Sequence, residues 1–524
     1  MSGLPLLTVL TVFCLIGSLQ SAKVLVFNPY FAHSHFTFQN ALAKELVQAG
    51  HDVTILVPEV DPTTIRTPAN TTLLIRKETV APFRFADDES ATSVYWKSEG
   101  FEFWNNRPMM KAWNEASTAA CRRLLQDTEF IEKVKAEKFD IAVMEPLDMC
   151  GFGLLKLIGL KNYVLTIPLA LADYAANTLG LPGRKEVKFA VNTDFYPDMG
   201  LIERIQNFGT PHLNNLIHDM EISVSAVREL ADPDFNYDDI YPNARYIFLN
   251  AEEHVDFPRP ISHKTIYIGG ITINKAAAKP LPPVLAPAFD AASTGVVLVS
   301  FGSLAKSSAM PPEIKSAFIE MFEAFPQLTF VWKYENISTY PAEHLPNVVP
   351  SPWIPQKDIL NHPKTLAFIT HGGMNSITEC AHAGVAAVAV PLFGDQPRNA
   401  KMLEYRKTAV IVDKQDITAE NLIKAMKAAI SPEFQKRADD LAAVIAAKPM
   451  QPKERFVKYF DHAVAFGDVE DFLDIKMRHM NVIRYYDLDI YLSFSAIVVG
   501  VLYLLTLTVK NVLSLVPITK SKTA

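Results

Sequence analysis

The stretch from residue 351 to residue 396 constrains the fold of this chain more than any other part of it. It holds two short apolar runs, Leu366–Thr370 and Val385–Val390, whose length and composition suit buried strands of a parallel sheet. Between them we expect one helix, beginning near residue 375 or 376 and ending at Gly384, where glycine suits a left-handed C-terminal cap. A strand, a helix and a second strand in this order predict an α/β fold.

The turn between the first run and the helix carries the groups of an anion site. His371 is followed by Gly372 and Gly373, which let backbone N–H groups approach a ligand closely. The helix N-terminus adds positive partial charge, and Asn375 and Ser376 add polar side chains at the same rim. These features together predict that the turn binds phosphate.

Residues on either side of this turn extend the predicted site. Trp353 offers a flat face on which a base could stack, and Gln356 follows three residues later. Asp395 and Gln396 come after the second strand, at the carboxyl end where open parallel sheets bind ligands. An aromatic face, a phosphate cradle and a pair of hydroxyl-binding groups predict a nucleotide-sugar site.

The order of these residues resembles the signature of the UDP-glycosyltransferases. The segment reads W-x-P-Q, then H-P, then F-I-T-H-G-G-x-N-S-x-x-E, then P-x-F-x-D-Q, over about 45 residues. The resemblance implies that Trp353 stacks on uracil and that Gln356 and Glu379 reach the uridine. It assigns the diphosphate to His371, Gly373, Asn375 and Ser376, and the sugar hydroxyls to Asp395 and Gln396. A competing interpretation is that Ser376 and Glu379 form a capping box, which would occupy both side chains with backbone N–H groups.

The length and composition indicate two domains. At 524 residues the chain is too long for one core, and its net charge of −7, without a basic run, does not indicate a nucleic-acid partner. The Pro/Ala-rich stretch Asn274–Ser293 predicts a linker. The resemblance implies the GT-B fold, with two facing Rossmann-like domains: an N-terminal acceptor-binding domain at 23–275 and a C-terminal UDP-sugar-binding domain at 276–450. Crossover and juxtamembrane helices at 451–489 follow.

The first domain should begin with a βαβ unit. Lys23–Asn28 and Asp52–Val57 read as strands, with a helix from about His35 to Ala49 between them. The turn before this helix contains no glycine, which argues against a dinucleotide fingerprint and hence against a nicotinamide-dependent oxidoreductase.

The turn before this helix contains two histidines that could act in catalysis, His33 and His35. If Ser34 caps the helix, His35 lies in the first helical turn, where the helix dipole disfavours the imidazolium and keeps a general base neutral. The resemblance assigns the catalytic histidine to this Ser-His pair, and hence to His35. His33 is the alternative base.

A catalytic histidine usually needs an acid to orient it. Glu145 and Asp148 follow the predicted strand Phe139–Met144, and Glu145 stands where vertebrate members of the family typically have aspartate. Asp148 has the shorter side chain, and we expect it slightly ahead of Glu145 as the partner of His35.

Two further positions follow from the resemblance. The strand Gly295–Ser300 leads into a glycine and then Ser303, and the family places a diphosphate contact at this serine. Phe257–Pro260 resembles a family landmark, and its Arg259 would pair either with the carboxylate of a uronic acid donor or with a structural acid.

Both ends of the chain predict membrane targeting. Residues 1–22 read as a signal peptide, with an apolar run at Leu4–Ile16. Ile490–Val509 is a 20-residue run without charge, long enough to span a bilayer, and the tail at 510–524 is basic. The body would then be lumenal in a single-pass type I protein of the endoplasmic reticulum membrane, and Lys520-x-Lys522-x-x resembles a dilysine retrieval signal.

The sequence gives only short motifs for glycosylation, disulfide and metal sites. Asn70 and Asn336 begin glycosylation sequons, which matter if the body is lumenal. After removal of Cys14, three cysteines remain, at 121, 150 and 380, and nothing in their spacing selects a disulfide pair. Two D-x-D patterns, at 232–234 and 487–489, lack supporting context, so we expect no metal.

The sequence therefore predicts a glycosyltransferase that moves glucose or glucuronic acid from a UDP-sugar to a hydroxyl of a small lipophilic acceptor. We expect inversion at the anomeric carbon, the UDP-sugar as co-substrate and no other cofactor. The expected partners are the donor, the acceptor and the membrane, and a homo-oligomer is left open. The alternative is a catalytically silent relative that binds lipophilic ligands or a partner enzyme in the membrane.

Overall fold

The computed structural model of the chain describes residues 21–29, 33–58, 70–76, 95–96, 103–181, 200–202, 222–273, 280–467 and 472–515. Most of the predicted signal peptide, the linker residues 274–279 and the predicted retrieval signal at Lys520 and Lys522 lie outside the described residues.

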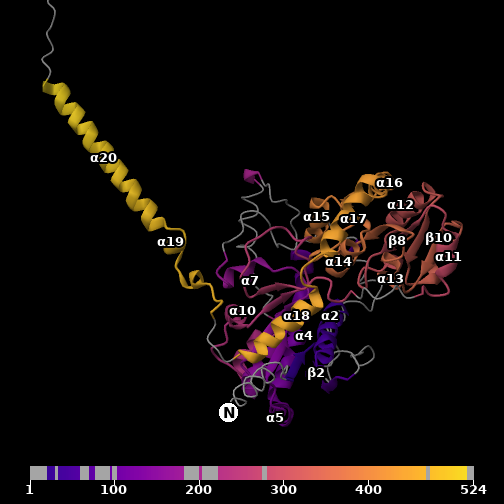
Figure 1. Cartoon of the computed structure of the whole chain (residues 1–524), viewed down its shortest axis with the longest axis horizontal. Coiled ribbons are helices and arrows are strands. Elements are labelled where there is room, and N and C mark those ends of the chain that lie inside the picture. The colour runs from indigo at the N-terminus through magenta and orange to yellow at the C-terminus, as the bar shows by residue number, and fades with distance from the viewer. Residues whose placement is uncertain are drawn as a thin grey trace, which may run out of the picture.

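Two sheets, each with all of its strands parallel, form the body of the molecule (Figure 1). The first has seven strands, in the order β3 Thr72–Arg76, β2 Asp52–Pro58, β1 Lys23–Phe27, β4 Ile141–Met144, β5 Tyr163–Ile167, β6 Ile247–Leu249 and β7 Thr265–Tyr267. The second has six, in the order β10 Val348–Ser351, β9 Thr329–Lys333, β8 Val296–Ser300, β11 Thr365–Thr370, β12 Ala386–Ala389 and β13 Ala409–Ile411. The predicted α/β class with two Rossmann-like halves is confirmed.

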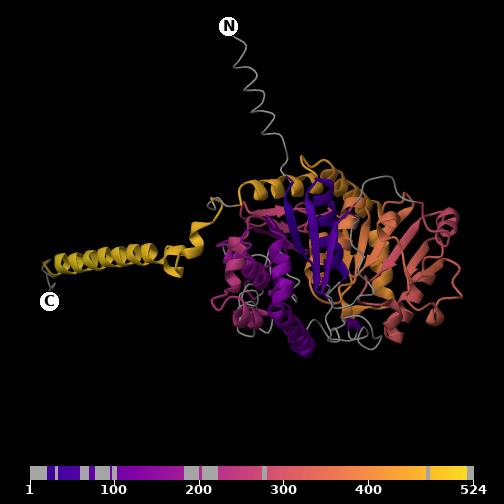
Figure 2. The ribbon, with the colours of Figure 1, turned by 90° about the horizontal axis from the view of Figure 1, so that it is seen from below.

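Helices cover the faces of both sheets (Figure 2). Beside the first sheet lie α2 His33–Gln48, α4 Phe103–Gln126, α5 Thr128–Ala136, α6 Cys150–Ile158, α7 Asp173–Thr178, α9 Val224–Leu230 and α10 Ile240–Asn243. Beside the second sheet lie α11 Ala286–Ala291, α12 Pro312–Glu323, α13 Gln356–Leu360, α14 Met374–Ala383, α15 Gln396–Tyr405, α16 Ala419–Ala429 and α17 Pro432–Ala446. Because the central strands are buried on both faces, β1, β4 and β8 consist almost entirely of apolar residues.

The unit predicted from residues 351–396 is present. Strand β11, helix α14 and strand β12 follow one another, and Gly384 ends the helix in the left-handed conformation with a φ of 71°. Helix α14 begins at Met374, one residue before the predicted start. Helix α2 begins at His33, two residues early, so Ser34 lies inside the first turn and is not the N-cap that we expected.

The chain passes from the first sheet to the second between Tyr267 and Val296. The predicted linker falls in this interval, but its end is not irregular: α11 forms there, with Phe289 buried. The predicted domain boundary after residue 275 lies within this interval, and its exact position remains a prediction.

Helix α18, Pro452–Ala465, returns from the second half to the first, as Figure 1 shows beside α2. Asp461 accepts a hydrogen bond from His51 at 2.9 Å, and Lys453 pairs with Glu45 at 2.8 Å. Phe456 packs against Phe248 of β6 with ring centroids 4.8 Å apart. The C-terminal segment therefore ties the two halves together.

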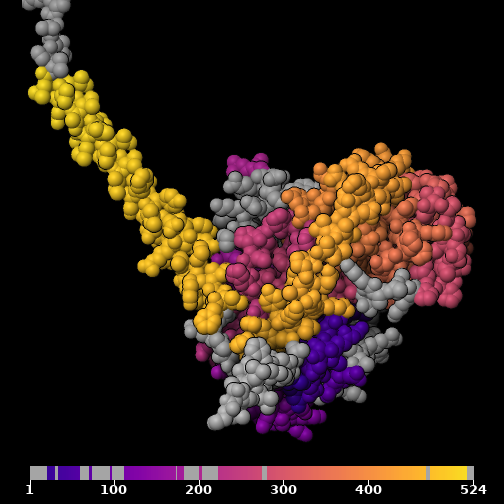
Figure 3. Space-filling view, viewed as in Figure 1, coloured from indigo at the N-terminus to yellow at the C-terminus, as the bar shows by residue number. Residues whose placement is uncertain are grey.

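Helix α20, Leu488–Leu515, projects away from the body, and Figure 3 shows its side chains standing clear of it. Its most apolar window has a mean hydropathy of 2.2, and none of that window is buried inside the molecule. It contains the predicted span Ile490–Val509, and within the described residues it is the one helix long and apolar enough to cross a membrane. The short helices α19 Val482–Tyr485 and η5 Lys476–His479 precede it.

The structure selects a disulfide that the sequence left open. Cys121 of α4 and Cys150 at the start of α6 are bonded, with their Cα atoms 5.4 Å apart, whereas Cys380 is buried and free. The bond ties two helices that cover the same sheet.

We expect loss of this disulfide to lower the free energy of unfolding of the first half. The two cysteines are 29 residues apart in sequence. Closing a loop of that length removes entropy from the unfolded chain that corresponds to about 3 to 4 kcal/mol. Cys121→Ser should lower the midpoint of urea unfolding accordingly, and a reductant should lower the wild-type midpoint but not that of the variant. Equal sensitivity of both proteins to reductant would contradict the bond.

Candidate active site

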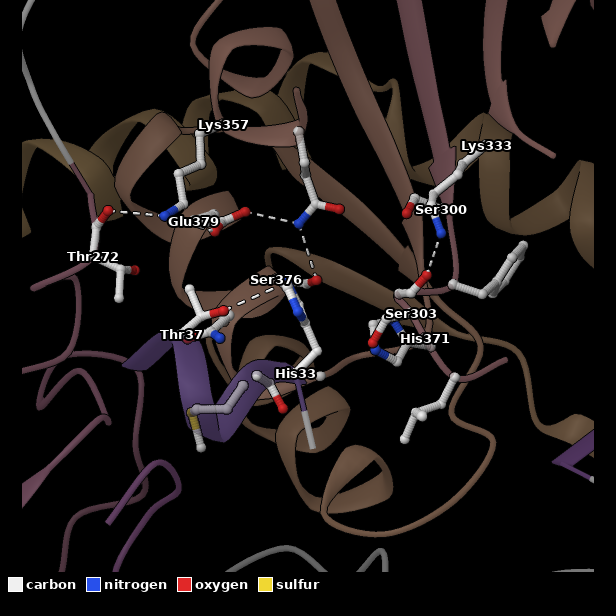
Figure 4. A pocket seen from close by; sticks show the side chains of 18 of the residues that line it. His33, Thr37, Thr272, Ser300, Ser303, Lys333, Lys357, His371, Ser376 and Glu379 are labelled. Atoms are coloured by element: carbon white, nitrogen blue, oxygen red, sulfur yellow. Dashed lines mark hydrogen bonds and ion pairs between the residues drawn. The ribbon is translucent and has the colours of Figure 1, made fainter. Parts of the chain in front are cut away.

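A cleft of about 500 Å³ lies between the two halves of the chain, where the carboxyl ends of the strands meet. The first half contributes the start of α2, and the second half contributes the segments after β8, β11 and β12 together with α13 (Figure 4). Of the predicted catalytic and donor-binding residues, Glu145 and Asp148 do not line the cleft. The others do: His35, Ser303, Trp353, Gln356, His371, Gly373, Asn375, Ser376, Glu379, Asp395 and Gln396.

The imidazole of His371 packs closely against Gly302 and Gly373. A Cβ atom at Gly302 would come within 2.7 Å of the His371 Nε2, and one at Gly373 within 2.6 Å. Gly302 also has a φ of 80°, which a residue with a side chain rarely adopts. The backbone can therefore approach a ligand closely here, and Gly373 is the N-cap of α14.

The imidazole of His371 is held in its neutral form. Burial lowers its pKa to about 4, and the nearby Lys333 charge adds to the effect. Its Nδ1 is buried and makes no hydrogen bond within the described part of the chain. A buried polar atom without a partner is costly, so it indicates a ligand that is not part of the chain.

Lys333 is a site residue that the sequence analysis missed. It ends β9, and its Nζ donates to the Gly302 carbonyl at 2.6 Å and to Glu335 Oε1 at 3.0 Å. Figure 4 shows it pointing toward Ser303 and His371. The signal was a single lysine closing an otherwise apolar strand, because such a residue lies at the edge where parallel sheets bind ligands.

The other end of the cleft is built on Trp353 and Gln356. Trp353 is 68% exposed although it is large and apolar, as a stacking platform requires. Gln356 Nε2 donates to Ser376 Oγ at 3.1 Å and to Glu379 Oε2 at 2.7 Å. The capping-box interpretation is therefore wrong: α14 has no side-chain cap, and Ser376 and Glu379 are bound by Gln356.

His35 is paired with Glu145 across the first sheet. The His35 Nδ1 is hydrogen-bonded to Glu145 Oε1, and Gln39 donates to the other carboxylate oxygen. Burial opposes the imidazolium of His35, but the charge and hydrogen bond of Glu145 outweigh it and raise the pKa of His35 above 6.5. This differs from our expectation that the helix dipole keeps the ring neutral, because a carboxylate in contact acts more strongly than a helix end.

Asp148 does not reach His35. Its carboxylate accepts a hydrogen bond from the Cys150 backbone N–H at 2.9 Å, at the start of α6. Burial raises the pKa of Asp148 to about 6. Glu145 follows β4 directly, and β4 pairs with β1, which leads into the helix of His35. The sheet therefore places Glu145 opposite His35, and the order of preference that we derived from side-chain length is reversed.

Asp395 and Gln396 lie at the start of α15 and line the same cleft as His35 and Gly373. Asp395 accepts a hydrogen bond from Asn399, and its charge and that of His35 act on each other. Gln396 Oε1 accepts from the backbone N–H groups of Leu392 and Phe393, at 2.9 and 3.0 Å. The Gln396 oxygen is thus occupied by backbone, and its amide nitrogen is the group left for a ligand.

Arg259, the two D-x-D patterns and one further acidic cluster all lie outside the cleft. Arg259 donates to the Leu171 carbonyl and does not line it. Asp232 of the first D-x-D pattern pairs with Lys156 at 3.0 Å, and the second pattern borders α20. Glu252, Glu253 and His254 form a cluster spaced like metal ligands, but Lys448 bonds to both of the carboxylates.

Comparisons with known proteins agree with the geometry. A family model described as "UDP-glucoronosyl and UDP-glucosyl transferase" matches residues 22–522. The chain is 28% identical over 496 residues to UDP-glucuronosyltransferase 2C1 of Oryctolagus cuniculus, covering 90% of this chain and 94% of that one. It is 27% identical over 520 residues to UDP-glucuronosyltransferase 1A9 of Homo sapiens, covering 97% and 93%.

A solved structure supports the fold. It is the complex of a UDP-glucosyltransferase from Polygonum tinctorium with 3,4-dichloroaniline, which superimposes with a TM-score of 0.56 at 16% identity. The match covers 85% of this chain and 98% of that one. At this identity it shows a shared two-domain architecture.

We expect the pairing of His35 with Glu145 to make stability depend on pH. Because the folded-state pKa of His35 is raised, its stabilisation is fully present below the usual histidine pKa of 6.5 and is lost as the pH rises through the folded value. Glu145→Gln removes the carboxylate charge. The difference in melting temperature between wild type and this variant should therefore be larger at acidic than at alkaline pH. A difference that does not change with pH would contradict the pairing.

Proposed function

Because the chain belongs to the UDP-glucuronosyl and UDP-glucosyl transferase family, we propose that it moves a hexosyl group from a UDP-sugar to a hydroxyl of a small lipophilic acceptor. Membership makes it a UDP-glycosyltransferase with a UDP-sugar donor; the acceptor class and the stereochemical course are the proposal. One observation carries it: a histidine–carboxylate pair from the first half and a glycine-lined helix start from the second half face the same cleft.

In this proposal the donor lies along the second half. Uracil stacks on Trp353, and the ribose binds Glu379, whose partner Gln356 also reaches the uridine. The diphosphate binds at the start of α14, where Gly373, Asn375, Ser376, His371 and Ser303 line the cleft. Lys333 joins this set as the cation at the same end. The sugar then extends to Asp395 and Gln396, next to His35.

His35 acts as the general base. Its Nδ1 is bonded to Glu145, and in this proposal the other ring nitrogen, Nε2, takes the proton of the acceptor hydroxyl. The acceptor oxygen forms a bond to the anomeric carbon as the bond from that carbon to the diphosphate oxygen breaks, and UDP leaves from the opposite face. The configuration inverts in this single step. Glu145 stabilises the imidazolium that forms, in keeping with the raised pKa of His35.

The nature of the acceptor is supported by the apolar part of the lining. Leu169, Leu304, Met374 and Phe393 face the cleft beside the polar groups. Such a surface suits a small lipophilic alcohol or phenol. Both glucose and glucuronic acid present hydroxyls to Asp395 and Gln396, so the donor sugar is decided by the experiment below.

We further propose that the chain is a type I protein of the endoplasmic reticulum membrane, with a cleaved signal peptide and its body in the lumen. Helix α20 supplies the span, and the Cys121–Cys150 disulfide suits an oxidising compartment. Asn70 is exposed at a turn, and Asn336 lies at the surface beside Ser338, whose hydroxyl donates to it at 2.6 Å. Both are proposed glycosylation sites.

The donor and the base are tested together. The purified chain, incubated with labelled UDP-glucose or UDP-glucuronate and a panel of phenols, should release UDP with one of the two donors. His35→Ala should lower the turnover number by about 10²- to 10⁴-fold, the usual contribution of a general base. His33→Ala is the matched control, because His33 has no carboxylate partner among the described residues, and it should lose far less. Unchanged turnover in His35→Ala would remove His35 from the mechanism.

The proposal also assigns the diphosphate charge to protein groups, with no metal ion. Prolonged treatment with a chelator should therefore leave turnover unchanged, because the start of α14, Lys333 and the His371 N–H group hold the leaving group. Loss of turnover that added Mg²⁺ or Mn²⁺ restores would contradict this assignment.

A further inference from the structure

A side chain of the first half bonds directly to the predicted diphosphate site of the second half. Asn250 follows β6 and is 1% exposed. Its backbone N–H donates to the Ile167 carbonyl at 2.8 Å, which fixes it at the carboxyl edge of the first sheet. Its Nδ2 donates to Asn375 Oδ1 at 2.8 Å, across the junction between the halves.

The orientation of both amides follows from one acceptor. Asn250 Nδ2 also lies 3.3 Å from the Pro168 carbonyl oxygen, which can only accept a hydrogen bond. The amide nitrogen of Asn250, and not its oxygen, must therefore face both Pro168 and Asn375. Asn375 must accept this hydrogen bond with its own amide oxygen, because two facing N–H groups would repel each other. A backbone carbonyl of the first half thus sets the rotation of the Asn375 amide.

This rotation decides which group Asn375 offers to a ligand. Asn375 is the second residue of α14 and lines the cleft beside Gly373 and Ser376. With its oxygen bound to Asn250, the group that remains is Nδ2, which makes no hydrogen bond to an acceptor in the described part of the chain. A donor at a helix start suits an anion. The opposite rotation would present a carbonyl oxygen to the phosphates.

The geometry points to Asn250 as a positioning residue for donor binding: it holds the Asn375 amide with its N–H groups toward the diphosphate, so that the anion site in the second half is completed by the first half. This inference rests on the proposed function, because it takes the anion to be the diphosphate of a UDP-sugar. Diphosphate affinity then depends on the contact between Asn250 and Asn375 across the junction, whereas uridine binding at Trp353 and Gln356 does not.

The test compares the affinities of UDP and uridine within each variant of the full chain in detergent micelles, by calorimetry for UDP and by competition for uridine. Asn250→Asp replaces the donor by an acceptor, so Asn375 must turn its nitrogen toward residue 250 and its oxygen toward the phosphates. We expect UDP affinity to fall about tenfold or more relative to uridine affinity, as for loss of a hydrogen bond to a charged group. Misfolded protein lowers the apparent affinities for UDP and for uridine by the same factor. The ratio of the two affinities is therefore unaffected by the misfolded fraction.

Two further variants separate positioning from general damage. Asn375→Ser removes the amide whose rotation matters, so adding Asn250→Asp to it should leave the ratio of UDP to uridine affinity unchanged. Asp256→Asn disturbs another buried contact of the junction, the pair with Arg398, and does not touch the cleft, so it should keep the wild-type ratio.

The outcomes are distinct. An unchanged ratio in Asn250→Asp, or an equal fall in the Asn375→Ser background, would overturn the positioning role while leaving the proposed function in place. A similar fall in Asp256→Asn would also overturn it, since any loosening of the junction would then suffice. If the wild-type chain binds neither UDP nor uridine, the proposed function itself fails.

Discussion

The cleft depends on the position of one sheet relative to the other, and charged contacts buried at the junction hold that position. Arg398 of α15 pairs with Asp256 at 2.5 Å, and both side chains are almost fully buried. Lys448, between α17 and α18, pairs with Glu252 at 2.7 Å. Removing one partner of such a pair costs about 3 to 5 kcal/mol, because the other charge remains buried without water or a counter-charge. The two carboxyl edges are therefore kept face to face, and helix α18 reinforces this by packing on the first half.

This arrangement shifts the pKa values of two histidines in one cleft in opposite directions, as the two proposed roles require. His35 contacts the Glu145 carboxylate, which raises its pKa against the effect of burial, so this ring can take up a proton. His371 is buried near the Lys333 ammonium, and both factors lower its pKa to about 4, so this ring stays neutral. The difference arises from the neighbouring charge, since burial acts to lower the pKa of both rings. The different surroundings of the two histidines thus give one ring a raised pKa and the other a lowered pKa.

The parts of the site that could be predicted are those encoded within a few residues. The Gly372–Gly373 turn, helix α14 and the strands on either side follow from apolar runs and a helix stop at Gly384, all of which are local signals. For Lys333 the local signal was its place at the end of β9, but its contact with Gly302 could not be predicted in this way, because the two residues are 31 positions apart. The sequence analysis also ranked Asp148 ahead of Glu145 as the partner of His35, and the structure reverses that order. Side-chain length says nothing about which loop position faces β1.

By itself, the sequence determined the α/β class, the family resemblance, the long apolar run near the C-terminus and eleven of the residues that line the cleft, because periodicity and short motifs act over one strand or one helix. Only the tertiary structure decided which side chains act on one another. His35 and Glu145 are 110 positions apart, Asn250 and Asn375 are 125 apart, and Asp256 and Arg398 are 142 apart. Such pairs exist because parallel strands bring distant segments to one edge, and no local pattern records which of those segments will meet.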